Sequence, residues 1–288
     1  MEQEKKRKNN LARNLMGAGM NVQLDNNIKR VLSNKWILAT ILKGVAEEVH
    51  DYDVEFIEKC IEGTPQISIV SVEPGMARYE PEDIAGNNTE DGIVGEGYIR
   101  YDLRFDVNLP KMKGTIKLLM NLEAQKKTNP GYPIVSRGIF YCCRMISSEY
   151  GVEFTSPEYG DIKKVYSIWI CMNAEEDAIA VYDVRKRDLV AGIPDVKSDY
   201  DLLTVVQIWI RGENKEEKLL EKEKDYPVLG MLNTLLDPQL KAVDKIENLS
   251  EKYRIPMTYD LREAKSSPHQ RARILLRKIR RMCRRCVI

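Results

Sequence analysis

Two neighbouring stretches of the chain alternate between apolar and polar residues, a pattern typical of β-strands with one buried face. In 98–109 every second side chain from Ile99 to Leu109 is apolar, and in 115–125 the same holds from Ile116 to Ala124. The residues between them, PKMKG, contain the proline and glycine of a turn. We therefore predict a β-hairpin over residues 98–125.

One register of this hairpin pairs apolar residues with apolar residues. It sets Leu103 opposite Leu122 and continues in the same way to the turn. A slip by one residue would mismatch every face. Tyr101 then shares the apolar face with Leu103. Asp102 and Glu123 face each other on the polar side, with Cβ atoms about 5 Å apart.

The remaining patterns predict helices and further strands. Residues 35–49 have apolar residues at helical spacing, and Pro133 and Gly151 stand where proline starts and glycine ends a second helix. Apolar runs predict strands at 66–72, 163–173, 178–184 and 202–210. A loop rich in Gly, Pro and acids lies at 73–97, and two helical stretches, VLGMLNTLLD and LKAVDKIENLSEKY, follow a charged run after residue 211.

These elements divide the chain into three parts. Residues 1–33 are a polar and basic arm, 34–211 are the main domain, and 212–288 are a charged linker and helical region with a basic tail. The hydrophobic fraction of 43% and the charged fraction of 31% fit an ordinary globular protein. Neither a signal-like segment nor an apolar run of the roughly 20 residues that span a bilayer is present. We expect a cytoplasmic protein without a membrane partner.

The composition restricts the chemistry. The chain has two histidines, His50 and His269, so a His-Glu-x-x-His zinc helix is excluded and a Ser-His or Cys-His nucleophile is disfavoured. Six cysteines show no disulfide rhythm. The one Cys-x-x-Cys, Cys283 with Cys286, lacks a second ligand pair at zinc-site spacing. If the protein is an enzyme, carboxylates must perform its reaction.

The two facing acids of the hairpin are the first candidates. Two carboxylates opposite each other destabilise a hairpin unless positive charge lies between them. A divalent ion with oxygen ligands supplies that charge, and Mg²⁺ is the usual choice where one or two carboxylates meet a phosphate. Asp106 lies about 13 Å along the strand from Glu123, so Asp102 is the better partner. The alternative is a solvated sheet face on which Arg100 and Arg104 neutralise the acids.

These residues resemble the PD-(D/E)XK nuclease superfamily, and in particular its transposase-associated branch, which includes the recombination-promoting nucleases. The superfamily has an Asp on one strand of a hairpin and Glu-x-Lys on the next, and the branch commonly has Gln instead of that Lys. YDLRF followed by NLEAQ is similar to this arrangement. RGIFY (137–141) resembles the branch's Arg-x-x-x-Tyr helix, and YGDIKKVYSIWI (159–170) resembles its next strand. The similarity covers roughly residues 32–261.

The resemblance implies an α/β fold with a restriction-endonuclease-like core, in which a mixed β-sheet is flanked by helices; this chain adds a C-terminal helical extension. It also implies that Asp102, Glu123 and the backbone carbonyl of Ala124 bind Mg²⁺ or Mn²⁺. Gln125 takes the place of the Lys, where it could orient the attacking water but supplies no positive charge. Lys127 shares its strand face and could compensate.

Two further site residues follow from the resemblance. Arg137 could hold a phosphate, although an arginine snorkelling from a packed helix is the ordinary alternative. In the family a helix with an acid precedes the hairpin, and here that helix is 35–49. Glu48 lies at the edge of its apolar stripe while Glu47 points away from it. Glu48 is thus the expected third acid, and a solvated residue at the helix end is the alternative.

The implied function is a metal-dependent DNA endonuclease that hydrolyses phosphodiester bonds, with a homodimer expected by analogy. A catalytically weak nuclease-fold protein that binds DNA or a protein partner is the alternative. Residues 269–288 hold eight Lys or Arg and no acid, in a basic amphipathic pattern that could bind DNA, a partner or an anionic membrane surface. A membrane-surface adaptor is therefore a third hypothesis.

Overall fold

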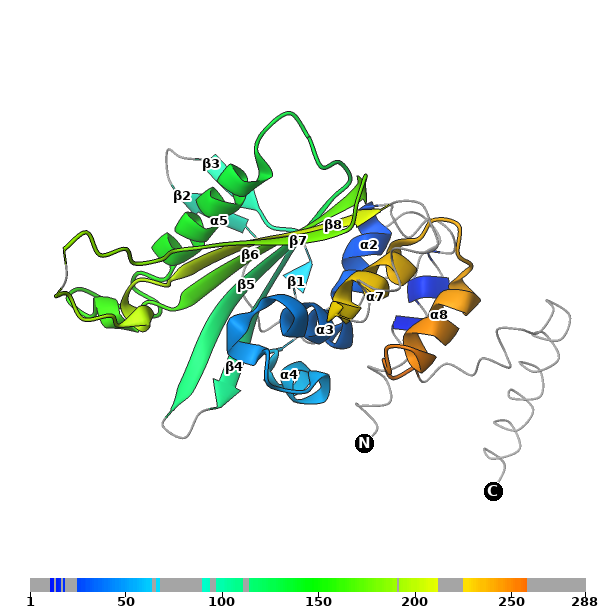
Figure 1. Ribbon diagram of the computed structural model, residues 1–288, viewed down its shortest axis with the longest axis horizontal. Helices are drawn as coiled ribbons and strands as arrows, with labels where there is room; N and C mark the ends of the chain where they lie inside the picture. Colours follow the sequence, from blue (N-terminus) through cyan, green and yellow to red (C-terminus); the bar gives the residue numbers. More distant parts are fainter. Residues whose placement is uncertain are drawn as a thin grey trace, which may run out of the picture.

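A mixed β-sheet runs through the middle of the protein, and helices pack on both of its faces (Figure 1). The computed structural model describes residues 11–12, 14–16, 18, 25–63, 66–67, 90–93, 97–110, 114–190, 192–211 and 225–257. The sheet has the strand order β1-β4-β5-β6-β8-β7. Strands β1, β4 and β5 are antiparallel neighbours, β5, β6 and β8 are parallel, and β7 is antiparallel at one edge. The predicted α/β class with a mixed sheet between helices is confirmed.

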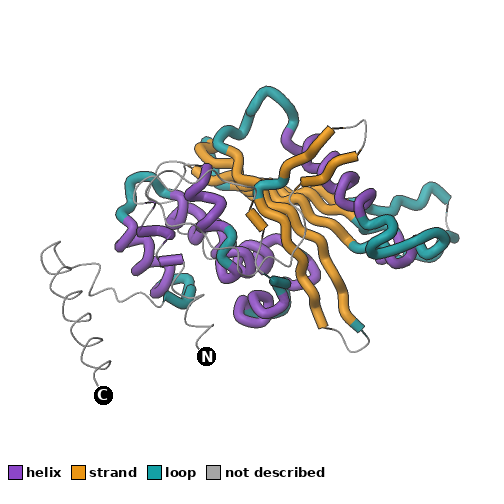
Figure 2. The backbone as a smooth tube through the Cα atoms, turned by 180° about the vertical axis from the view of Figure 1, so that it is seen from behind, coloured by secondary structure: helices purple, strands orange, loops and turns teal. Residues whose placement is uncertain are grey.

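The element bounds agree with much of the predicted pattern, and Figure 2 shows the same arrangement from behind. The strands are β1 (Gln66–Ile67), β2 (Glu90–Ile93), β3 (Gly97–Arg100), β4 (Leu103–Pro110), β5 (Thr115–Gln125), β6 (Lys164–Ala174), β7 (Ala178–Asp183) and β8 (Leu203–Arg211). The helices are α2 (Asp25–Leu32), α3 (Lys35–Val45), α4 (Val54–Cys60), α5 (Ile134–Ser148), α7 (Pro227–Leu236) and α8 (Ala242–Glu251), with short 3-10 turns η1 (Glu47–Val49), η2 (Tyr159–Asp161) and η3 (Lys197–Asp199).

The hairpin has the predicted register. Strand β5 covers the predicted residues 115–125, and β4 pairs Leu103 with Leu122. The predicted strand 98–109 is wrong in its extent, because the chain leaves the sheet at residues 101–102 and residues 97–100 pair with β2 in a separate two-stranded sheet. Tyr101 consequently lies on the face opposite to Leu103, where its ring packs edge-on against Tyr141 with centroids 5.2 Å apart.

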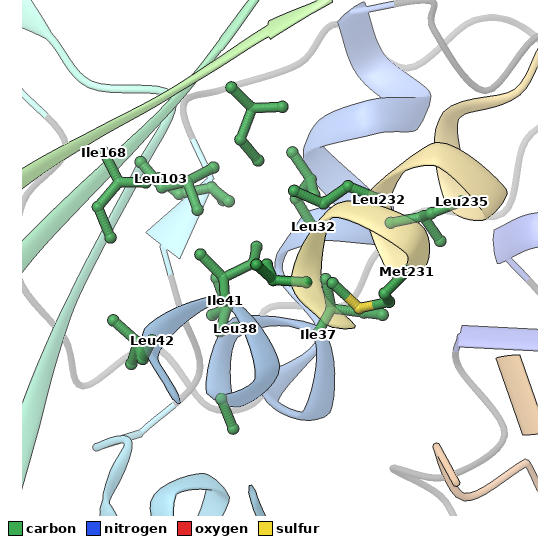
Figure 3. Close-up of a cluster of buried hydrophobic side chains, with 14 of the residues drawn as sticks. Leu32, Ile37, Leu38, Ile41, Leu42, Leu103, Ile168, Met231, Leu232 and Leu235 are labelled. Carbon is green, nitrogen blue, oxygen red and sulfur yellow. The ribbon is translucent and has the colours of Figure 1, made fainter. Parts of the chain in front are cut away.

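The larger core lies between the sheet and the helices α2, α3 and α7 (Figure 3). Leu103 and Ile168 point to this side from the strands, and Leu38 of α3 and Leu232 of α7 belong to the same cluster. Helix α2 adds Leu32 to the same cluster. The last residues of the segment predicted as a polar arm, 25–32, therefore pack into the core of the main domain.

On the other face of the sheet, α5 packs against β6 and β8. It begins directly after Pro133, as predicted, and ends about one turn before the predicted end. Gly138 permits the close approach of this helix, because a Cβ at this position would lie 2.6 Å from Val205 Cγ1 and 3.0 Å from Trp169 Nε1. The contact sets the height of α5 above the strands, and with it the position of the neighbouring Arg137.

The predicted helix 35–49 is interrupted near its end. Helix α3 starts after Asn34, whose side chain accepts a hydrogen bond from the Trp36 N–H at 3.0 Å, and it ends at Val45. Ala46 is extended (φ −104, ψ 120), and η1 follows as a separate turn. The apolar spacing continues through Ala46 to Val49, so the periodic pattern did not reveal the break.

The helices in the described part of the C-terminal region are α7 and α8, and both contribute buried residues to the main core. No helix within the described ranges is long and apolar enough to cross a membrane. Several predicted features lie outside the described residues: most of the loop 73–97, the charged run 212–224, the basic tail and the pair Cys283 and Cys286.

Candidate active site

Asp102 and Glu123 lie next to each other near the carboxyl end of β5. The backbone N–H of Asp102 donates a hydrogen bond to Glu123 Oε1 at 3.0 Å, and the backbone N–H of Ala124 donates to Asp102 Oδ2 at 3.1 Å. These bonds extend the contact between the hairpin strands one residue beyond the last ladder pair, Leu103 with Leu122. The structure thus brings the two acids together, although Asp102 lies just outside β4.

Glu123 is buried and held by a network of side chains on β5 and β6. It is 5% exposed. Asn121 Nδ2 donates to Glu123 Oε1 at 2.8 Å, Ser167 Oγ donates to Asn121 Oδ1 at 2.6 Å, and Trp169 Nε1 donates to Ser167 Oγ at 2.9 Å. The network fixes the orientation of the carboxyl group, because each member is itself held by the next.

The surroundings of Glu123 disfavour its ionised form. Burial, together with the negative charge of Asp102, raises the pKa of Glu123 to about 8, and the nearby charges of Arg137 and Lys29 oppose the rise without cancelling it. At neutral pH and without a bound cation, Glu123 is therefore largely protonated. A divalent cation would stabilise its ionised form, and strongly perturbed acids of this kind gather at functional sites.

Arg137 projects from α5 into a group of aromatic rings near Glu123. Its guanidinium carbon lies 5.0 Å from the ring centroid of Tyr141 and 5.2 Å from that of Trp169. Its Nε donates to the Tyr141 hydroxyl at 3.0 Å, and Nη1 donates to the hydroxyl of Tyr132. The arginine and tyrosine of the Arg-x-x-x-Tyr pattern are thus in direct contact. Arg137 packs against aromatic rings and remains partly exposed.

Sequence reasoning missed a lysine that contacts this cluster. Lys29 of α2 is 8% exposed, and its Nζ lies 2.8 Å from Asp102 Oδ1. The adjacent Ile28 and the later Leu32 pack in the main core and hold α2 against the sheet near β5. The only local signal was a basic residue beside the apolar positions of a short amphipathic helix. Nothing in that pattern indicated a contact with the hairpin.

Glu48 lies away from the acid pair, on the opposite face of the sheet. Its Oε2 accepts a hydrogen bond from the Tyr166 hydroxyl at 2.6 Å, and its Oε1 lies 2.9 Å from Lys164 Nζ. Tyr166 belongs to the larger core, whereas Glu123 faces α5. Tyr166 also pairs with Met120, roughly 10 Å along β5 from Glu123. The expected placement of Glu48 beside the pair is corrected by this geometry, since η1 directs its side chain to the start of β6.

The electrostatic state of Glu48 differs accordingly. Burial acts to raise its pKa, but the hydrogen bonds from Tyr166 and Lys164 outweigh burial and bring the pKa of Glu48 below its ordinary value. Lys164 also contacts Asp201 Oδ2 at 2.6 Å. Glu48 is therefore an ionised member of a paired charge cluster.

The remaining predicted residues follow Glu123 along the chain. Ala124 supplies the N–H that binds Asp102. Gln125 is the last residue of β5, is partly exposed and shares the strand face of Glu123. Lys127 is exposed beyond the strand. The carbonyl of Lys126 accepts a hydrogen bond from Asn173 Nδ2 at 3.1 Å, which anchors the chain directly after the site.

The chemistry of this donor set fits a hard divalent cation. Asp102 and Glu123 offer carboxylate oxygens at adjacent positions, and a divalent ion would favour the ionised form of Glu123 against the burial and the charge of Asp102 that raise its pKa. Within the described ranges, no group of three or more His, Cys, Asp or Glu side chains could hold a metal. Water and phosphate oxygens would therefore complete the shell, as is usual for Mg²⁺ bound by one or two carboxylates.

Comparisons with known proteins give no independent indication of function. No family model, curated protein or solved structure matches this chain. The functional argument depends on the residues and geometry of the site.

Proposed function

We propose that this protein is a metal-dependent DNA endonuclease of the PD-(D/E)XK type, related to the transposase-associated nucleases. The main supporting observation is the contact between Asp102 and Glu123 across the β4–β5 hairpin, in which each acid also binds the backbone of the other strand. A buried acid pair with one strongly raised pKa at the end of a strand is suited to phosphodiester chemistry with a divalent cation.

The order of the elements supports a restriction-endonuclease-like core. Helix α3, the hairpin of β4 and β5, helix α5 and strand β6 follow one another along the chain, and β6 lies parallel to β5. This is the helix, hairpin, helix and strand succession that the resemblance implies. The contact between Arg137 and Tyr141 adds a second point of agreement with the Arg-x-x-x-Tyr pattern.

The residues have distinct tasks in this proposal. Asp102, Glu123 and the carbonyl of Ala124 would hold Mg²⁺ or Mn²⁺. When bound, the ion supplies positive charge toward the phosphate and makes an attached water more acidic. Gln125 orients the attacking water from the same strand face, and Asn121 fixes the Glu123 carboxyl.

The positive side chains near the site would bind the negatively charged substrate. Arg137 faces Glu123 from α5, and the exposed Lys127 follows the strand. Both would contact phosphates of DNA and hold the scissile bond in place. We also propose that the protein acts in the cytoplasm and as a homodimer, as many nucleases do.

A plasmid cleavage assay tests the proposal. The parent protein should nick or cut plasmid DNA with Mg²⁺ or Mn²⁺, and Asp102→Asn and Glu123→Gln should abolish cleavage while circular dichroism shows that both variants are folded at the assay temperature. Asp183→Asn is a matched control, because Asp183 pairs with the exposed Arg185 on the edge strand β7. A parent that does not cut, or two acid variants that cut as well as the parent, would contradict the assignment.

A catalytically weak nuclease-fold protein that only binds DNA or a partner is the second candidate. It is favoured by the neutral Gln125 and by Glu48, which is engaged by Tyr166 and Lys164 on the other face of the sheet. This function predicts that the parent retards labelled DNA in a gel without cutting it at any Mg²⁺ or Mn²⁺ concentration. Loss of cleavage in Asp102→Asn would decide against it.

A further inference from the structure

The best-placed cation beside the acid pair comes from outside the hairpin. Lys29 reaches Asp102 from α2, and its ammonium lies 2.8 Å from Asp102 Oδ1 with 10% of its side chain exposed. The other oxygen of Asp102 accepts the Ala124 N–H. The carboxylate is therefore held from two sides, by a strand backbone and by a nearly buried lysine.

The packing of α2 makes this contact a fixed feature of the fold. Ile28, directly before Lys29, is 1% exposed, and Leu32, three residues after it in the same helix, is fully buried. An ammonium group is strongly hydrated, and a lysine that is 8% exposed has lost most of that water. The ion pair with Asp102 compensates for this loss of hydration. The ammonium group of Lys29 therefore stays beside Asp102.

The hairpin has no positive charge at residue 125, the position at which the nuclease superfamily that it resembles has a lysine. Gln125 is neutral, and Lys127 is exposed beyond the end of β5. Arg137 donates hydrogen bonds to the hydroxyls of Tyr132 and Tyr141 and, within the described part of the chain, forms no ion pair with either acid. Lys29, in contrast, already binds one of the two acids.

We propose that Lys29 is a positioning residue of this site that supplies the positive charge absent at Gln125. In the metal-free protein it balances Asp102 and holds that carboxylate against Ala124. A divalent cation at the acid pair is repelled by this ammonium, whereas a phosphate brought to the same place is attracted by it. The inference rests on the proposed nuclease function. It adds that Lys29 attracts the negatively charged phosphodiester of the substrate.

The proposal predicts two effects of opposite sign for one substitution. Lys29→Met keeps the length of the side chain and removes its charge. Without DNA, Mn²⁺ should bind about tenfold more tightly to this variant, the size expected for one unit charge acting on a divalent ion a few ångströms away in a water-like medium. With DNA and saturating Mn²⁺, the single-turnover rate constant for cleavage should fall about a hundredfold, as for the loss of one charge-stabilising contact.

The experiment combines Mn²⁺ titration by calorimetry with single-turnover cleavage of a labelled duplex, on the full chain. Lys29→Arg keeps the charge and should retain most of the parent behaviour in both assays. Lys59→Met is the control, since Lys59 is an exposed residue of α4 paired with Glu55. Thermal unfolding of every variant identifies a general loss of structure, which would weaken Mn²⁺ binding rather than strengthen it.

The outcomes separate this inference from the proposed function. If Lys29→Met binds Mn²⁺ no more tightly than the parent, or if Lys29→Arg loses as much cleavage as Lys29→Met, the role of Lys29 is structural and the inference is wrong. If Lys127→Met loses cleavage and Lys29→Met does not, the missing charge comes from Lys127. A parent that binds Mn²⁺ but does not cut DNA contradicts the proposed function alone, and the Mn²⁺ titration still decides on Lys29. A parent that binds no Mn²⁺ overturns both.

Discussion

Two acidic clusters lie on opposite faces of the same sheet, and they differ in how their charge is balanced. Glu48 is bound by Lys164 and by the hydroxyl of Tyr166, and its pKa is lowered. Glu123 is more deeply buried and lies beside Asp102, and its pKa is raised to about 8. The first cluster contains its own shared cation, Lys164, whereas the second would gain stability from an added positive ion.

This difference distinguishes a structural acid from a candidate catalytic one. Both glutamates are partly or fully buried, and both fit the family pattern when only the sequence is considered. The distinguishing property is the local balance of charge. Lys164 contacts Glu48 and Asp201 together, at 2.9 Å and 2.6 Å. On the other face, Lys29 contacts Asp102 but leaves the pKa of Glu123 far above its ordinary value.

The largest expected difference between the clusters is in cleavage. Glu123→Gln should lower the rate of plasmid cleavage about a thousandfold, because it removes a charge that the transition state depends on. Glu48→Gln should leave the rate within about threefold of the parent, since Glu48 lies on the far face and contacts β6. Initial rates of nicking with Mg²⁺ check this pair of variants. Equal losses in both would mean that Glu48 takes part in the reaction after all.

The next largest effect is on stability. Lys164→Met should lower the free energy of unfolding by about 3 kcal/mol, because it leaves the largely buried Glu48 and Asp201 without their shared cation. Denaturant unfolding followed by circular dichroism measures the change. Lys59→Met is the comparison, because Lys59 and its partner Glu55 are both exposed, and its cost should be much smaller. A loss of the same size in both variants would remove the distinction between balanced buried charge and surface charge.

The pH dependence of stability should have opposite signs for the two glutamates in metal-free protein. The raised pKa of Glu123 means that between about pH 4.5 and pH 8 the folded state holds a proton that the unfolded state releases. The unfolding free energy of the parent should therefore fall relative to Glu123→Gln as the pH rises through this window, by roughly 5 kcal/mol at about 1.4 kcal/mol for each pKa unit.

Glu48 should show the reverse. Because its pKa is lowered on folding, its contribution is present above the ordinary pKa and is lost as the pH falls through the folded value. The advantage of the parent over Glu48→Gln should therefore shrink in acid. Unfolding curves of the three proteins from pH 3 to pH 9 test both slopes. If the unfolding free energies of the parent and Glu123→Gln change in parallel with pH, the pKa of Glu123 is not raised by folding.

The sequence predicted the structure best where the residues of a single strand or hairpin determine its position and pairing. Alternation along 115–125 predicted the extent of β5 and the pairing of Leu103 with Leu122, since a register error would expose a whole apolar face. The same alternation failed at Tyr101, because periodicity does not show where a chain leaves one sheet and joins another.

The site was predictable only in part for a similar reason. Asp102 and Glu123 follow from hairpin register, which is a local property. Glu48 and Lys29 owe their positions to long-range contacts, with β6 and with Asp102 directly before β4, that no local pattern encodes. The extended Ala46, which separates Glu48 from α3, was equally hidden, because alanine is a strong helix former.

The most direct test of the account is a calorimetric Mn²⁺ titration of the metal-free parent, Asp102→Asn, Glu123→Gln and Glu48→Gln. The account predicts one strong site in the parent, loss of that site in both Asp102→Asn and Glu123→Gln, and unchanged affinity in Glu48→Gln. Unchanged Mn²⁺ affinity in either hairpin variant would contradict the claim that Asp102 and Glu123 hold one divalent cation together.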